Sequence, residues 1–148
     1  MKMLRTIALL VLSLSLGACA VNRESANFEP NRDLVKTDIF FVERFTPDKR
    51  DLNRIMADRI TARGFEATAG EKGTTPDNAT VLVTYVDKWM WDLTNYMIEL
   101  TITFRDSESG VAYASGNSYH TSLTRLSPEE MIDEVLTNIF DADKEPAE

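Results

Sequence analysis

The stretch that decides the fold is Tyr96-Met97-Ile98-Glu99-Leu100-Thr101-Ile102-Thr103-Phe104-Arg105. Apolar side chains at every second position, from Tyr96 to Phe104, alternate with mostly polar ones. A period of two is typical of a strand with one buried face. Met97 is the one apolar residue on the second face. The sequence therefore predicts a half-buried strand over residues 96–105.

Two further strands are predicted on either side of this one. Residues 80–91 form a long strand that ends in a turn at 92–95, and residues 106–110 form a hairpin loop that leads into a strand at 111–121. Strands that follow one another through short loops pair antiparallel. The middle of the chain is therefore predicted to be a three-stranded meander.

Two amphipathic helices are predicted outside the meander. Ser127-Pro128-Glu129-Glu130 is a capping box with proline at the first helical position. The other helix is predicted to start with Thr46 as N-cap and Pro47 as first helical residue, and to end at Gly64 in a left-handed cap. Apolar residues at spacings of three and four form one stripe on each helix. The stripes are Leu52, Ile55, Met56 and Ile60, and Met131, Ile132, Val135, Leu136, Ile139 and Phe140.

The first strand is predicted over residues 34–45, centred on Ile39-Phe40-Phe41-Val42, and a short strand over 65–68. This order of elements predicts an α+β two-layer sandwich: a mostly antiparallel sheet of four or five strands with two helices on one face. Residues 34–141 are expected to form the single domain, and residues 142–148 an acidic tail.

The N-terminus has the pattern of a secretory signal peptide over residues 1–18. Lys2 and Arg5 precede an apolar segment of about ten residues, where roughly twenty are needed to span a bilayer. Residues 19–33 are polar and aperiodic, and are predicted to be a flexible tether with a reach of roughly 20 Å.

Leu16-Gly17-Ala18-Cys19 resembles the lipobox of bacterial lipoproteins, and Cys19 is the only cysteine. The resemblance implies that Cys19 becomes the N-terminus of the mature chain and carries acyl chains such as palmitate. Because residue 20 is alanine and not aspartate, it also implies sorting to the periplasmic side of the outer membrane of a Gram-negative bacterium.

The element order, together with this predicted location, resembles that of small periplasmic α+β lipoproteins. These include the lipopolysaccharide-assembly lipoprotein of the outer membrane and the lipoprotein activators of cell-wall synthases. The resemblance implies a non-enzymatic role in binding or assembly, with an envelope protein or a second copy of the chain as partner.

Composition excludes several classes of function. The net charge of −8 disfavours nucleic acid as a partner. A single cysteine and a single histidine exclude an internal disulfide, a multi-cysteine zinc site and a two-histidine catalytic centre. No cofactor is expected, and the chain is predicted not to be an enzyme.

His120 is flanked by Ser118 and Ser122. Side chains two residues apart on a strand lie roughly 7 Å apart, which is too far for direct proton transfer, so His120 is expected to face solvent or cap a turn.

The strand over residues 80–91 is apolar on both faces. A turn of two or four residues at 92–95 would place Trp89 on the same sheet face as Leu100 and point Asp87 towards the core. A turn with an odd number of residues would instead place Lys88 and Met90 on the face of Leu100. Either register predicts an apolar patch on the face of the sheet that the helices leave open. This patch is either an interaction surface or is covered by the tether, by the loop at residues 69–78 or by the twist of the sheet. The candidate partner-binding residues are Tyr85, Asp87, Trp89, Trp91 and Met97. The strands at 65–68 and 34–45 are the expected sheet edges.

Two alternatives remain open. A glycan hydrolase would stack sugars on Trp89 and Trp91, use Asp87 or Glu99 as acid, and need two carboxylates across a groove. A small-ligand sensor would need a pocket between the sheet and the helices.

Overall fold

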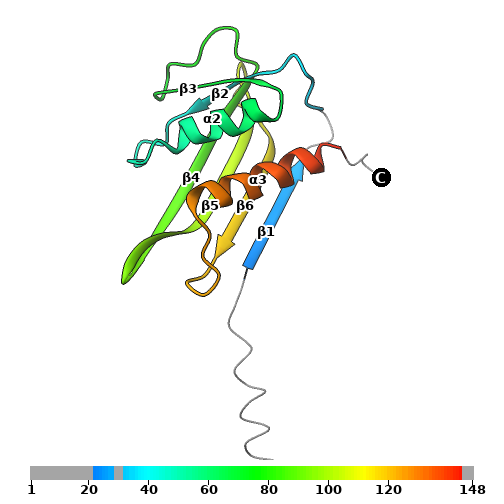
Figure 1. Ribbon diagram of the computed structural model, residues 1–148. Helices are drawn as coiled ribbons and strands as arrows, with labels where there is room; N and C mark the ends of the chain where they lie inside the picture. Colours follow the sequence, from blue (N-terminus) through cyan, green and yellow to red (C-terminus); the bar gives the residue numbers. More distant parts are fainter. Residues whose placement is uncertain (1–21, 29–31, 145–148) are drawn as a thin grey trace, which may run out of the picture.

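The computed structural model describes residues 22–28 and 32–144 of the chain (Figure 1). The predicted signal peptide, Cys19 and the last four residues of the predicted acidic tail lie outside the described residues. The elements in chain order are β1 (Asn22–Phe28), β2 (Ile39–Glu43), α2 (Leu52–Ala62), β3 (Glu66–Gly70), β4 (Val81–Asp92), β5 (Thr94–Asp106), β6 (Ala112–His120) and α3 (Pro128–Ala142). In the described part, no helix is both long enough and apolar enough to cross a bilayer.

The sheet has six strands in the order β1-β6-β5-β4-β2-β3, and both helices cover one face (Figure 1). The α+β class and the two helices are confirmed. The predicted sheet of four or five mostly antiparallel strands is corrected to a mixed sheet, because β2 pairs parallel with both β3 and β4. Helix α2 connects β2 to β3, and a helical crossover of this kind brings the next strand back in the same direction.

One hydrophobic core lies between the sheet and the two helices. The Phe40 ring packs edge-on against Phe104, with a centroid distance of 5.4 Å. Helix α3 approaches β6 closely at Gly116, where a Cβ atom would lie 2.8 Å from Val135 Cγ1. Both predicted helix stripes contribute to this core, which fixes which face of the sheet is buried.

Helix α3 starts as the sequence predicts. The Ser127 hydroxyl accepts a hydrogen bond from Glu130 N at 3.2 Å, and Glu130 Oε2 accepts one from Ser127 N at 2.7 Å. The hydrogen bond from Ser127 N lowers the pKa of the Glu130 carboxyl below its usual range. The left-handed Gly64 after α2, with φ of 91°, is also confirmed.

The predicted start of the first helix at Thr46 and Pro47 is wrong, because α2 begins at Leu52. Instead, the buried Asp48 carboxylate accepts hydrogen bonds from Arg50 N at 2.7 Å and from Leu52 N at 2.8 Å. The carboxylate therefore satisfies free N–H groups at the helix N-terminus from outside the helix.

The predicted flexible tether contains a strand. β1 pairs antiparallel with β6, from Asn22 opposite His120 to Phe28 opposite Ala114. Pairing at a sheet edge uses backbone N–H and C=O groups, so it needs no hydrophobic pattern in the sequence. β1 and β3 are consequently the two edges. The expected edge at 65–68 is confirmed within β3, whereas the first predicted strand, now β2, is interior.

A β-bulge changes the side-chain pattern of β5. Lys88 is opposite Glu99, but the next residue, Trp89, is opposite Met97, which leaves Ile98 as the extra residue on β5. The bulge moves Met97 onto the buried face and removes Ile98 from it. The predicted alternation therefore holds from residue 100 onward and fails before it.

Candidate functional site

Three of the five predicted partner-binding residues do not lie where a partner on the open face could reach them. Tyr85 is 3% exposed and Met97 is 1% exposed, both on the helix-covered side. Tyr85 therefore lies on the core face, as in the alternative that points Asp87 towards the core, whereas the expected place of Met97 on the open face is wrong. The Tyr85 hydroxyl donates to Asp48 Oδ2 at 2.7 Å, and burial raises the pKa of the phenol. Asp87 also points to the helix side, where its carboxylate accepts a hydrogen bond from Trp89 Nε1.

Trp89 and Trp91 differ in their surroundings although they lie two residues apart on one strand. The Arg50 guanidinium lies 3.6 Å from the centre of the Trp89 ring, so Trp89 is half-buried beneath the loop before α2. Trp91 is 71% exposed. Of the five predicted residues, only Trp91 therefore presents most of its side chain to solvent.

The open face of the sheet is polar over β5 and β6. Asn117 Nδ2 donates to Thr101 Oγ1 at 2.8 Å, and the Thr103 and Ser115 hydroxyls lie 3.2 Å apart. Apolar side chains on the described part of this face lie mainly along β2 and β4, and Phe41 on β2 is 3% exposed. On β4, the expected apolar patch is a narrow stripe of exposed or half-exposed side chains formed by Leu82, Val86 and Met90.

Exposed large apolar side chains gather at the tip of the β4–β5 hairpin and on the loop after β6. Leu93 at the tip is 89% exposed, and Leu123 on the loop is 74% exposed. Leu93 also has φ of 58°, a left-handed conformation that a leucine adopts only at a cost.

Arg125 joins the loop after β6 to the hairpin tip. It donates to Thr94 Oγ1 at 2.9 Å and to Asp92 Oδ2 at 3.0 Å, and its guanidinium lies 4.1 Å from the centre of the Tyr96 ring. Arg125 thus ties the loop that carries Leu123 to the hairpin tip that carries Leu93. We define the apolar tip as Met90, Trp91, Leu93 and Leu123.

The tip of the β4–β5 hairpin and the loop after β6 lie at the end of the molecule where β1 begins (Figure 1). Asn22, the first residue of β1, is paired with His120, the last residue of β6. Glu99 on β5 is opposite Tyr119, near the end of β6. β5 starts five residues before Glu99, at Thr94, so the hairpin extends roughly 17 Å beyond the end of β6. The apolar tip and the start of β1 therefore share one end of the sheet.

His120 is buried, so the expected solvent-facing histidine is wrong. Its Nε2 lies 2.8 Å from Glu134 Oε2 on α3, and the Ser118 hydroxyl donates to the same oxygen. Ser118 is fully buried, and the carboxylate lies between serine and histidine. Because a catalytic triad needs histidine in the middle and an accessible serine, this cluster links α3 to β6 and has no triad geometry. Sequence reasoning missed Glu134, whose only signal was its place beside the stripe of α3.

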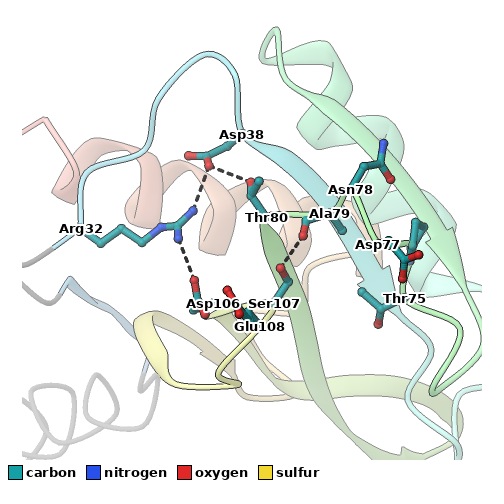
Figure 2. A pocket seen from close by; sticks show the side chains of 11 residues that line it. Arg32, Asp38, Thr75, Asp77, Asn78, Ala79, Thr80, Asp106, Ser107 and Glu108 are labelled. Carbon is teal, nitrogen blue, oxygen red and sulfur yellow. Dashed lines mark hydrogen bonds and ion pairs between the residues drawn. The ribbon is translucent and has the colours of Figure 1, made fainter.

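A polar cavity of about 610 Å³ lies at the opposite end of the sheet (Figure 2). Arg32 bridges the buried Asp38 at 2.9 Å and Asp106 at 3.2 Å, and the Thr80 hydroxyl donates to Asp38 at 2.8 Å. Hydrogen bonds from Ser109, together with Arg32, lower the pKa of Asp106. The inward-pointing charges are paired with one another, so the cavity is a junction that fixes the β1–β2 connection to β4 and β5.

The carboxylates proposed for glycan hydrolysis do not face one another. Asp87 lies on the helix side of β4, whereas Glu99 forms an ion pair with Lys88 at 2.6 Å on the open face. Within residues 22–28 and 32–144, no group of three or more His, Cys, Asp or Glu side chains could hold a metal ion.

No family model matches the chain, and no curated protein matches it. Among solved structures, the chain is similar to a PelC dodecamer from Paraburkholderia phytofirmans, with 17% identity and a TM-score of 0.61 over 80% of this chain and 98% of that one. A single-residue variant of the same PelC dodecamer gives 18% identity and a TM-score of 0.59 over 80% and 97% of the two chains. At this identity the likeness concerns the fold alone: the chain shares its two-layer α+β architecture with PelC over nearly the whole PelC chain.

Proposed function

We propose that this chain is a non-enzymatic lipoprotein of the cell envelope, anchored through acylated Cys19 to the periplasm-facing leaflet of the outer membrane. In this proposal the apolar tip sits against the same leaflet, and the domain assembles with other copies into a scaffold that binds an envelope partner.

The observation that carries the proposal is the position of the apolar tip. Cys19 precedes the start of β1 by three residues, which extend over about 10 Å at most. An anchor at Cys19 would therefore hold the end of the sheet that carries Trp91, Leu93 and Leu123 close to the lipid. Exposed apolar side chains in water gain free energy when they enter the headgroup boundary, and tryptophan favours that region.

Self-assembly is supported by the fold. Both PelC structures that share this architecture are dodecamers. A closed ring of copies on one membrane requires every anchor to point the same way, and the apolar tip gives the domain such an orientation.

The anchor is tested by labelled palmitate incorporation in the producing cell. The wild-type chain should be labelled and should float with outer-membrane vesicles, whereas Cys19→Ser should be unlabelled and released from them. Labelling that persists in Cys19→Ser, or an unlabelled wild type, would disprove the lipid anchor.

The orientation is tested separately with the two tryptophans. The lipidated chain in vesicles of brominated phospholipid should show quenched tryptophan fluorescence, because bromine quenches a ring that lies at the leaflet. Trp91→Phe should abolish most of the quenching, and the matched variant Trp89→Phe should retain it. Equal quenching in both variants would show that the tip does not face the lipid.

A further inference from the structure

The two edge strands of the sheet run in opposite directions. β1 is antiparallel to β6, β6 to β5 and β5 to β4, whereas β4, β2 and β3 are mutually parallel along the sheet. β1 and β3 are thus antiparallel to each other and lie at opposite sides of the sheet. Two copies placed side by side with the same orientation would bring β1 of one against β3 of the next as an antiparallel pair.

Neither edge strand contains a proline or a lysine, two residues that commonly prevent such pairing. The charged residues of the edge strands are Arg23 and Glu24 in β1 and Glu66 in β3, and they lie outside the middle of each strand. The register shifts among the paired strands fall between β4 and β5 and between β5 and β6, and none falls in the pairings of β1 or β3. Natural sheets commonly protect exposed edges with prolines, lysines or bulges, so an edge without them is suited to receive another strand.

The middle of each edge strand is small and uncharged. Residues 25–27 are Ser-Ala-Asn and residues 67–69 are Ala-Thr-Ala. Small side chains on both faces allow the backbones of two copies to approach to hydrogen-bonding distance, about 4.8 Å between strands. In this arrangement the helices of neighbouring copies remain on the same side of a continuous sheet.

We propose that copies of this chain join head to tail through their sheet edges, with β1 of one copy paired antiparallel with β3 of the next. The proposal rests on the proposed function, because a shared membrane anchor fixes the common orientation. Antiparallel pairing of β1 with β1 would place the two Cys19 residues at opposite ends of the joined sheet, so both could not reach one leaflet. Two different edges instead give a heterologous contact, which repeats from copy to copy and forms a closed ring when the rotation between neighbours completes a circle.

Ser25 and Thr68 provide a test within the full lipidated chain. Both are exposed and both lie on the open face, Ser25 opposite Asn117 and Thr68 opposite Phe41. In envelopes treated with a short bis-maleimide, the double variant Ser25→Cys with Thr68→Cys should give a ladder of products that grow by one chain, with loss of the monomer band. Ser25→Cys with Glu66→Cys covers a register shifted by two residues on the same face.

The matched control is Ser25→Cys with Asp58→Cys, which pairs β1 with an exposed residue of α2 and should leave the monomer band intact. Native gels of the uncrosslinked variants report assembly independently. High-mass assemblies on native gels, with no crosslinked ladder from either double variant (Ser25→Cys with Thr68→Cys or with Glu66→Cys), would overturn the edge contact and leave the proposed function standing. A dimer formed by Ser25→Cys alone would also overturn the edge contact. Monomers throughout would refute both the edge contact and the self-assembly in the proposed function.

Discussion

Both ends of the β4–β5 hairpin carry large apolar side chains, but the surroundings of these side chains are opposite. At the base, Val83 and Phe104 face each other across the two strands and are fully buried under the helices. At the tip, Trp91 and Leu93 are 71% and 89% exposed. Because the helices end before the hairpin does, the same kind of side chain stabilises the fold at one end of the hairpin and is exposed at the other (Figure 1).

The largest expected effect is at the base. Phe104→Ala should destabilise the domain by about 3–5 kcal/mol, because it removes a buried ring from a cluster of phenylalanines and leaves a cavity. Trp91→Ala, the matched change at the tip, should alter the free energy of unfolding by less than about 0.5 kcal/mol. Urea denaturation of the two variants measures the contrast, and equal losses would show that the tip is part of the folded core.

The bulge between base and tip gives the next effect. Met97→Ala should cost about 2–4 kcal/mol, because Met97 is buried in the core. The same change at Ile98, which is half-buried, should cost less than about half as much. Thermal unfolding of both variants tests the register, and the reverse ranking would mean that β5 alternates without a bulge.

The smallest effect has the opposite sign. Leu93→Gly should stabilise the hairpin by up to about 1 kcal/mol, because glycine adopts the left-handed conformation at φ of 58° without a steric cost. The same variant should weaken membrane seating, because it removes the most exposed apolar side chain of the tip. Denaturation together with vesicle flotation separates the two effects, and a loss of stability would show that the leucine side chain supports the turn.

Only part of the candidate site could be predicted from the sequence. Trp91 was found because it belongs to the strand over residues 80–91, which is apolar on both faces, whereas Leu93 and Leu123 carried no pattern and were missed. The face of Tyr85 was left open and Met97 was misplaced, for one physical reason. Both depend on the pairing of β4 with β5, in which one extra residue, Ile98, changes the register. That pairing is not encoded in a local period.

The sequence by itself determined the helix stripes, the capping box of α3, the cap at Gly64 and the strand pattern from residue 100 onward, because each follows from local periodicity or local hydrogen bonding. Only the tertiary structure decided that residues 22–28 pair as an edge strand, that Asp48, held by the Tyr85 hydroxyl, caps α2 in place of Thr46, and that the hairpin tip is left uncovered. The edge pairing and the contact between Tyr85 and Asp48 join distant parts of the chain, and no local pattern records them.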